Sequence, residues 1–415
     1  MKVLTIGHSE SLGGAARAAY RVHCALRGQG IDSRMLVKYA GLGDWTVSSP
    51  YTGLQKVIAR LAPHVAQQVC RLHTTTNPIL RSPAFIPSRL LKQINASDAD
   101  VVHLHWVASE MLTVEAIGRI SKPLVWTLHD MWAFCGAEHY ASDERWRDGY
   151  LKSNRPADER GWDLNRWVWQ RKRKAWSTPL HIAAPSQWMA DCADQSALMR
   201  GWPIRVVPNT LDTDAWSPLD KPQARALMGI GGGRRLVAFG AWGVEQAHKG
   251  FDLLLAALKL LQNRQLEFEL LVFGQRAPQQ PMDLGFPVHY AGHLNDDLSL
   301  RVAYSAADIM VVPSRVESFG QSASEAHACG TPVVAFNACG LRDIVDHKVT
   351  GYLAQPFDVQ DLADGIEWVI AMHPGSAALG VNARNRAVAK FSYPVVADAY
   401  RRLYSDAVET YGRAA

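Results

Sequence analysis

Short apolar runs alternate with segments of helical periodicity along most of the chain. In the first half, the runs predict buried strands at 2–7, 101–107, 124–128, 181–184 and 204–207. In the second half, they predict strands at 236–241, 268–274, 288–291, 309–312 and 333–336. Strands separated by helices are typical of parallel sheets with helices on both faces. The pattern therefore predicts an α/β protein with two successive Rossmann-like domains that face each other across a cleft.

The chain is long enough, at 415 residues, for two domains that each bury a core of their own. A stretch rich in proline and glycine at 217–233 interrupts the alternation and is the best candidate for the domain boundary. We expect an N-terminal domain at 1–207 and a C-terminal domain at 208–385. The last segment, 386–415, has a helical pattern and is expected to pack back on the N-terminal domain.

Composition excludes several classes of protein. Hydrophobic residues make up 48% of the chain and charged residues 20%, as in ordinary globular proteins. The net charge of +5 suits an anionic ligand or an anionic membrane surface and is too small to predict nucleic-acid binding. No apolar stretch reaches the roughly 20 residues that span a bilayer, and the first apolar run is too short for a signal peptide. The six cysteines form no CxxC pair, so we expect reduced thiols in a cytoplasmic protein: Cys24, Cys70, Cys135, Cys192, Cys329 and Cys339.

The stretch 308–336 carries the densest group of candidate functional residues. Its apolar beginning predicts a strand, and a polar loop then leads into a helix at about 322–329. In open parallel sheets ligands bind at the carboxyl ends of strands, where this loop lies. The loop and the helix carry two acids, Glu317 and Glu325. An alternative role for Glu325 is a capping box with Ser322, in which the carboxylate bonds back to its own helix start.

A second candidate is the turn after the first strand. Gly13 and Gly14 stand where that strand leads into a helix, so the backbone can approach a ligand and the helix amides can meet negative charge. Glycines also suit a tight turn without any ligand. The spacing is not a dinucleotide fingerprint, so no dinucleotide is predicted.

Three polar residues at element ends are candidates for substrate contacts. His129 and Asp130 end a predicted strand, where a histidine is a reasonable contact for a bound substrate. Asp130 would serve equally well as a loop cap that accepts hydrogen bonds from backbone amides. Lys249 stands just before a predicted helix and suits a phosphate, although a lone lysine is usually a surface residue.

His103 and His105 lie two residues apart in a predicted strand, so their side chains point to the same face. A metal would need further ligands, and none is nearby in the sequence. We therefore expect a packed or hydrogen-bonded pair and no metal site.

The segment 161–176 interleaves tryptophans with basic residues. On a helix this pattern suits a membrane interface, with the tryptophans at the level of the lipid headgroups. It suits equally well a core helix with one solvated basic face. The residues are Trp162, Trp167, Trp169 and Trp176, with Arg166, Arg171, Lys172, Arg173 and Lys174.

Several motifs together resemble the retaining glycosyltransferases of family 4, which have the GT-B fold. The strongest is PSRVESFGQSASEAHACGTPVVAF, which matches the family pattern of Pro-Ser, Glu, Phe-Gly, Glu-Ala and Gly-Thr-Pro-Val-Val-Ala almost position for position. The motifs HLHW, TLHDMW and GGAARAAYR further resemble the subgroup that builds bacterial exopolysaccharide and lipopolysaccharide sugars. The other matching pieces are Gly13-Gly14, His129, PNTLD at 208–212, and Lys249-Gly250.

The resemblance implies an acceptor side in the N-terminal domain and a site for a nucleotide-diphosphate sugar in the C-terminal domain. Glu325 would bind the ribose hydroxyls of this donor. Glu317, with the amides near Phe319 and Gly320, would hold the hydroxyls of the donor's sugar.

The resemblance also implies how the leaving group is stabilised. Lys249 would neutralise the diphosphate, and amides at Gln321, Ser322 and the Gly13-Gly14 loop would add hydrogen-bond donors. His129 would contact the transferred sugar. Retention would follow from same-face attack assisted by the leaving phosphate. No cofactor and no essential metal are expected, because the lysine and the amides take the place of a divalent ion.

This chain departs from the family pattern at two positions. Ala241 stands where members often carry an arginine, so the diphosphate loses one expected cation, and the candidates to replace it are Arg315, Arg342 and His248. Cys135 stands alone where the subgroup often has several cysteines.

The predicted function is that of a retaining hexosyltransferase that uses a nucleotide-diphosphate sugar. Its acceptor would be a glycan or a lipid-linked glycan in cell-surface polysaccharide biosynthesis, and its location the cytoplasm, with peripheral contact to the inner membrane face. The alternatives are a non-catalytic nucleotide-sugar-binding subunit and a GT-B epimerase or phosphorylase. The motifs do not distinguish UDP, GDP and ADP donors, individual acceptors, linkage positions or oligomeric states.

Overall fold

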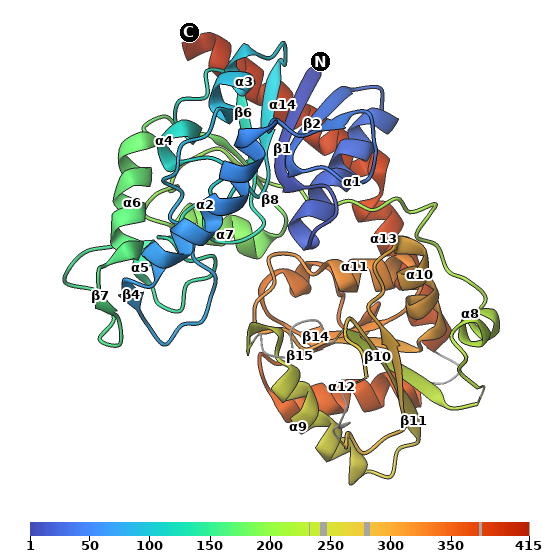
Figure 1. Ribbon diagram of the computed structural model, residues 1–415. Coiled ribbons are helices and arrows are strands. Elements are labelled where there is room, and N and C mark those ends of the chain that lie inside the picture. The colour runs from blue at the N-terminus through green and yellow to red at the C-terminus, as the bar shows by residue number, and fades with distance from the viewer. Residues whose placement is uncertain (232, 241–246, 278–282, 373–375, 415) are drawn as a thin grey trace. The chain divides into compact units, whose positions relative to one another are not determined.

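The computed structural model describes residues 1–231, 233–240, 247–277, 283–372 and 376–414 (Figure 1). The chain divides into two compact units. Met1–Thr210 and Val396–Ala415 make up the first unit, and Leu211–Val395 the second. The division therefore falls before the 217–233 stretch that composition marks as the boundary. That stretch contains α8 (Lys221–Leu227), which packs on α10 (Asp297–Ala306) within the second unit.

The first unit is built on a parallel sheet with the strand order β3-β2-β1-β5-β6-β8-β9. The order reverses between β1 and β5, which is where open parallel sheets place their ligand crevice. The strands are β1 (Lys2–Ser9), β2 (Asp32–Tyr39), β3 (Val47–Ser48), β5 (Val101–Leu104), β6 (Leu124–Thr127), β8 (His181–Ala184) and β9 (Ile204–Val206), and a separate antiparallel pair is β4 (His73–Thr74) with β7 (Arg160–Gly161). The helices are α1 (Gly14–Gly28), α2 (Leu54–Cys70), α3 (Leu90–Ala96), α4 (Val114–Ile117), α5 (Arg145–Asp148), α6 (Leu164–Ala175), α7 (Gln187–Gln195) and α14 (Tyr393–Ala414).

The second unit repeats this plan with the strand order β12-β11-β10-β13-β14-β15. Its pairs are parallel, and its order reverses between β10 and β13. The strands are β10 (Arg235–Gly240), β11 (Phe268–Phe273), β12 (Val288–Gly292), β13 (Ile309–Val312), β14 (Val333–Phe336) and β15 (Gly351–Ala354). The helical elements are α8, η1 (Ala247–Lys249), α9 (Phe251–Gln262), α10, α11 (Gln321–Ala328), η2 (Cys339–Asp343), α12 (Val359–Ala371) and α13 (Ser376–Phe391).

Strand β13 shows why the sheet is covered on both faces. Its four residues are buried, and successive side chains of a strand point to opposite faces. Ile309 and Val311 pack in one apolar cluster, whereas Met310 and Val312 pack in another. Two Rossmann-like α/β sheets are thus present, as the alternation of apolar runs predicts.

Helix α14 completes the first unit from the far end of the sequence (Figure 1). The hydroxyl of Tyr400 lies 2.9 Å from Oγ1 of Thr127 in β6. The hydroxyl of Tyr404 lies 2.8 Å from Nδ1 of His103 in β5. The helix therefore hydrogen-bonds to the sheet as well as packing on it.

Some elements differ from those predicted. Strand β5 ends at Leu104 rather than at residue 107. Strand β2 is absent from the apolar pattern because it alternates buried with exposed positions. Among the helices that the structure describes, none is both long enough and apolar enough to cross a lipid bilayer.

Candidate active site

Lys249 and Glu317 form a partly exposed ion pair at the end of the second sheet, where the strand order reverses. Nζ of Lys249 donates to Oε1 of Glu317 at 2.7 Å, and Oγ of Ser314 donates to the same oxygen at 3.0 Å. The lysine follows β10 and the acid follows β13, which are neighbouring strands. The side chain of Lys249 is 37% exposed. An ammonium has three N–H donors, so this group can bind an anion while it keeps Glu317.

A glycine sets the position of Lys249. Gly250 follows η1 with a φ of 67°, and a Cβ atom there would lie 2.0 Å from the carbonyl oxygen of Pro313. Only glycine therefore lets this turn pack against the end of β13. A backbone hydrogen bond of 2.8 Å from Arg315 to the carbonyl of His248 joins the same two loops.

The amino end of α11 opens beside this pair. Gly320 precedes the helix with a φ of 106°, and a Cβ atom there would meet Cδ2 of Leu341 at 2.6 Å. The first turn contains no acidic residue, so the positive end of the helix dipole is not neutralised by its own side chains. The helix begins at Gln321, and Ser322 lies inside its first turn. The capping-box alternative is therefore wrong, because Ser322 is not the N-cap.

Glu325 projects from the second turn of α11 and is 5% exposed. Its Oε2 accepts a hydrogen bond of 3.0 Å from the hydroxyl of Tyr304 on α10. The ring of Phe319 is buried and packs edge-on against Phe391 with their centroids 5.4 Å apart. Phe319 thus anchors the loop through its side chain, and only its backbone is suited to contact a ligand.

Three residues are candidates for the cation that the family pattern places at position 241, and their surroundings differ. Ala241 itself lies outside the described residues. Arg315 donates to both carboxylate oxygens of Asp252 at 2.7 Å, so its charge is already neutralised. Burial, with help from the neighbouring Lys249, lowers the pKa of His248 and disfavours its cationic form. Arg342 is exposed on η2, two residues beyond Gly340, whose amide donates to the Glu317 carbonyl at 2.9 Å.

The glycine loop lies in the first unit. Gly13 precedes α1 with a φ of 90° and lines a cavity of about 250 Å³ together with Gly14, His8 and His105. Nothing lies within 4 Å of a Cβ atom built on Gly13, so its backbone conformation rather than space calls for glycine. Burial, followed by the charge of Lys38, lowers the pKa of His8 to about 4. The cavity is therefore lined by a neutral imidazole at neutral pH.

His129 belongs to a chain of three histidines in the same unit, of which His103 and His105 are fully buried. Nε2 of His129 lies 2.9 Å from Nδ1 of His105, and the ring of His105 packs against that of His103 at 4.1 Å. Nε2 of His103 lies 2.7 Å from Oγ1 of Thr127. Burial lowers the pKa of His129 to about 4, so its ring is neutral near pH 7. His103 and His105 are thus packed against each other, which is one of the two predicted alternatives, and the pair is part of a longer chain.

Asp130 caps its own loop. Its Oδ1 accepts from the amide of Trp132 at 2.9 Å, and its Oδ2 accepts from Trp106 at 2.9 Å and from His139 at 2.6 Å. Burial alone would raise the pKa of Asp130, but His139 and these hydrogen bonds hold it below its ordinary value. The loop-cap alternative is the one that the structure supports.

The tryptophan-rich basic segment forms α6, and most of it is internal. Trp169 and Trp176 are each 4% exposed, and Lys172 is fully buried with its ammonium donating to the carbonyls of Cys135 and Gly136. Arg171 is paired with Glu115 at 2.6 Å. The core-helix interpretation is therefore supported for this segment, and its solvated basic face is limited to part of the helix.

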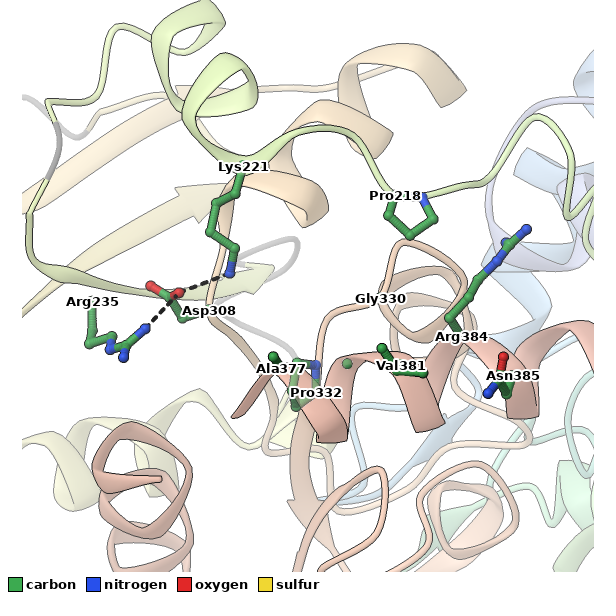
Figure 2. A pocket seen from close by; sticks show the side chains of 11 residues that line it. Pro218, Lys221, Arg235, Asp308, Gly330, Pro332, Ala377, Val381, Arg384 and Asn385 are labelled. Carbon is green, nitrogen blue, oxygen red and sulfur yellow. Dashed lines mark hydrogen bonds and ion pairs between the residues drawn. The ribbon is translucent and has the colours of Figure 1, made fainter. Parts of the chain in front are cut away.

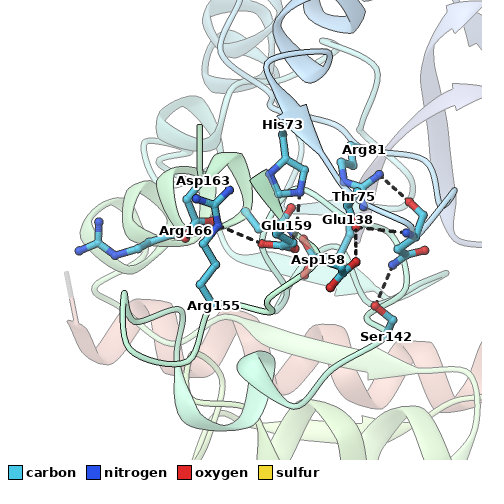
Figure 3. A network of polar contacts seen from close by, with 12 residues as sticks. His73, Thr75, Arg81, Glu138, Ser142, Arg155, Asp158, Glu159, Asp163 and Arg166 are labelled. Atoms are coloured by element: carbon cyan, nitrogen blue, oxygen red, sulfur yellow. Dashed lines mark hydrogen bonds and ion pairs between the residues drawn. The ribbon is translucent and has the colours of Figure 1, made fainter. Parts of the chain in front are cut away.

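Ion pairs tie the loops before α6 together (Figure 3). Arg145 donates to Glu159 at 2.9 Å and to Asp163 at 2.8 Å, and Nε2 of His73 lies 3.5 Å from Glu159. Asp163 also caps α6 by accepting from the amide of Arg166. This network fixes the irregular segment between β6 and α6.

A cavity of about 490 Å³ lies at the opposite edge of the second sheet from Lys249 (Figure 2). Asp308, which precedes β13, is paired there with Lys221 at 2.8 Å, Arg225 at 2.6 Å and Arg235 at 3.2 Å. Burial alone would raise the pKa of Asp308, but these cations hold it below its ordinary value. The cluster joins α8 to the sheet, which accounts for the charges without a ligand.

The structure groups the predicted donor-site residues of the second unit at one sheet edge. These are Lys249, Glu317, Phe319, Gly320, Gln321, Ser322 and Glu325. Gly13, Gly14 and His129 lie in the first unit, near its own point of strand reversal. Among the described residues, no three His, Cys, Asp or Glu side chains are arranged to hold a metal ion, and none of the six cysteines forms a disulfide.

Ser314 and Tyr304 contact the two acids and are not among the residues that the sequence motifs single out. Ser314 stands inside the PSRVESFG motif three residues before Glu317, so the motif itself was an available signal. Tyr304 is 21 residues from Glu325 and meets it only because α10 packs beside α11.

Fold and sequence together define the class of protein. Residues 12–215 match the family described as Glycosyltransferase Family 4, and residues 239–386 match Glycosyl transferases group 1. Sucrose-phosphate synthase from Thermosynechococcus elongatus superposes with a TM-score of 0.66 at 19% identity, covering 98% of this chain and 99% of that one. Anabaena HepE in complex with UDP-glucose gives a TM-score of 0.66 at 19% identity over 98% and 100% of the two chains. The chain has the GT-B fold of the group 1 and family 4 glycosyltransferases.

The chain is also similar in sequence to curated proteins that carry the name D-inositol 3-phosphate glycosyltransferase. The D-inositol 3-phosphate glycosyltransferase of Saccharomonospora viridis is 33% identical over 50% of this chain and 51% of its own length. The enzyme of the same name from Mycolicibacterium gilvum is 30% identical over 74% of this chain and 66% of its own. This chain thus spans about half the length of the first of these relatives. Neither relative carries a name from the exopolysaccharide or lipopolysaccharide subgroup, so that assignment stays a prediction.

Proposed function

We propose that the protein is a retaining hexosyltransferase that moves a sugar from a nucleotide-diphosphate donor to a glycan or lipid-linked glycan in cell-surface polysaccharide biosynthesis. The observation that carries the proposal is the pair of Lys249 and Glu317 at 2.7 Å, next to the amino end of α11. A cation, a carboxylate and helix amides at one sheet edge are what a sugar diphosphate requires.

Cleavage of the anomeric bond leaves a diphosphate with added negative charge. The ammonium of Lys249 and the first amides of α11 would stabilise this charge as it develops, because they are already in place before the reaction. Glu317 holds the ammonium and would accept hydrogen bonds from hydroxyls of the transferred sugar. The sugar itself passes through a transition state with oxocarbenium character.

Glu325 would bind the nucleoside. Its carboxylate is nearly buried and oriented by Tyr304, and a carboxylate accepts hydrogen bonds from both ribose hydroxyls. We expect no cofactor and no essential metal, so transfer should persist in EDTA.

The first donor to test is a UDP-sugar, because a solved neighbour of the same fold is described in complex with UDP-glucose. The names of the curated relatives favour a second candidate acceptor, D-inositol 3-phosphate, which is small and anionic. The chain's positive charge suits either this acceptor or an anionic lipid-linked glycan.

Two measurements test the proposal. Thermal shift against UDP-, GDP- and ADP-sugars identifies the donor, and release of nucleoside diphosphate with each acceptor then measures transfer. Donor binding without turnover on any acceptor would favour a non-catalytic binding subunit, whereas turnover without an acceptor would favour an epimerase. For the stereochemistry, NMR of the product should show an α-linkage from an α-configured donor, and a β-linkage would refute retention.

A further inference from the structure

Helix α2 turns its large apolar side chains outward. On an ordinary surface helix the large apolar residues face the core, but here the residues at 5% exposure are the small Ala62 and Ala66. The outward residues are Leu54 (74% exposed), Val57 (52%), Ile58 (51%), Leu61 (55%) and Val65 (52%). At 3.6 residues per turn they fall within an arc of about 100°, so they form one continuous stripe.

The chain around this helix has an unusual charge. Residues 45–97 contain no Asp or Glu, although the whole chain has 39 of them in 415 residues. The basic residues of this stretch are Lys56, Arg60, Arg71, Arg81, Arg89 and Lys92. Lys56 and Arg60 are exposed on α2 itself. The stripe is therefore accompanied by positive charge with no acid of the same stretch to offset it.

We propose that α2 lies in the surface of an anionic lipid bilayer, with the stripe at the boundary of the acyl chains and Lys56 and Arg60 among the phosphate headgroups. A strongly apolar stripe beside lysine and arginine is the pattern of helices that bind in the plane of a membrane interface. Each basic residue near an anionic leaflet adds attraction. A groove of about 560 Å³ lies between α2 and residues 86–89, and its lining is mixed, since Leu54 and Ile58 of the stripe share it with Arg89 and with Glu110, whose carboxylate accepts hydrogen bonds from backbone amides.

A second copy of this chain suits the surface less well. A symmetric contact through α2 would bring together two copies of a basic surface whose stretch, 45–97, contains no acid, and like charges repel. An anionic membrane complements both the apolar stripe and the charge. The inference goes beyond the proposed function and does not depend on it, because vesicle binding requires no transfer.

The proposed membrane contact lies on α2 and not on α6, whose tryptophan-rich basic pattern was the candidate for a membrane interface in the sequence. There Arg171 and Lys172 are engaged inside the protein, so neutralising them would disturb the fold rather than test a membrane contact. Arg173 and Lys174 are exposed and can be changed safely. The two helices therefore make different predictions.

Flotation with vesicles of equal parts phosphatidylcholine and phosphatidylglycerol tests the proposal. The wild type should float with these vesicles, and less so with pure phosphatidylcholine or at high salt, which screens the headgroup charge. Val57→Ser with Leu61→Ser should weaken binding at least about tenfold, because two large apolar side chains no longer enter the bilayer. Lys56→Gln with Arg60→Gln should weaken binding to the anionic vesicles alone.

Matched control variants distinguish binding through α2 from nonspecific binding of exposed apolar or basic residues elsewhere on the protein. Val381→Ser with Leu227→Ser removes side chains that are 59% and 73% exposed in the second unit, and should leave flotation unchanged. Arg173→Gln with Lys174→Gln should leave it unchanged as well, and a loss of flotation there would return the contact to α6 and overturn the proposal.

Two further results would refute the assignment. One is undiminished flotation of the Val57→Ser, Leu61→Ser variant. The other is a wild-type protein that does not bind the vesicles and sediments as a dimer, together with a Val57→Ser, Leu61→Ser variant that sediments as a monomer. Lys249→Ala should lower kcat/KM for transfer at least about a hundredfold and still float, so a failure of the proposed function is distinguishable from a failure of the membrane contact.

Discussion

The ammonium of Lys249 lies 2.7 Å from Oε1 of Glu317. The cation that would meet the donor's diphosphate is therefore held by the acid that would hold the donor's sugar. Loss of either side chain leaves the other without its partner, so the two are expected to act as a unit.

Lys249→Ala should lower kcat/KM at least about a hundredfold, as expected when a preorganised charge at the leaving group is lost. Steady-state kinetics with the identified donor measures the effect, and thermal unfolding checks the fold. Lys259→Ala is the matched control, since Lys259 is exposed on the helix that follows. Equal rates in the two variants would remove Lys249 from the site.

Glu325→Ala should raise the donor KM about tenfold or more, because hydrogen bonds to a charged group contribute about 1.5–3 kcal/mol. Tyr304→Phe should raise it only a few-fold, since it removes one hydrogen bond that orients the carboxylate. Tyr290→Phe, in the same unit, should have no effect. An unchanged donor KM in Glu325→Ala would refute the ribose contact.

Arg342→Gln should lower kcat/KM about fivefold or more if this residue supplies the charge that is missing at Ala241. Arg315→Gln should stay within about twofold, because Asp252 already neutralises Arg315 and exposed pairs contribute about 1 kcal/mol or less. The comparison of the two variants at low ionic strength is the measurement. The reverse order would assign the charge to Arg315.

Stability should fall as the pH drops from 6.5 towards 4. Burial, followed by the nearby His129, lowers the pKa of His103 to about 3, whereas an unfolded histidine titrates near 6.5. The unfolded state thus binds the extra proton first, so the stabilisation is complete above pH 6.5 and is lost as the pH falls. His129 and His105 shift in the same direction for the same reason.

Urea unfolding at a series of pH values isolates this contribution. His103→Gln removes one titrating group, so the slope of unfolding free energy against pH between 6 and 4.5 should decrease by up to about 1.4 kcal/mol per pH unit. Gln67→Ala, which changes an exposed side chain on α2 and removes no titrating group, is the control and should leave the slope unchanged. An identical slope in His103→Gln and the wild type would contradict the assignment.

The sequence predicted the strands 181–184, 309–312 and 333–336 to the residue, because each is a buried run with polar or turn residues at its ends. It predicted the grouping of Lys249 with Glu317 only through the family motif. Nothing local connects residues 68 positions apart, and the order of β10 and β13 brings them together.

The two amphipathic helices show where sequence patterns fail. Composition cannot say which face of a helix is covered, so it left a membrane surface and a core helix equally open for the basic, tryptophan-rich α6, which is mainly internal. Lys172 is buried there because backbone carbonyls bind its ammonium. The large apolar side chains of α2, by contrast, are exposed to solvent.

The return of α14 to the first unit has a consequence for the order of folding. The first unit buries Tyr400 and Tyr404 against strands whose residues are synthesised some three hundred positions earlier. During translation the second unit emerges complete while the first still lacks this helix. The first unit therefore cannot complete its native packing until α14 has been synthesised, and until then the sheet surface that Tyr400 and Tyr404 cover stays exposed.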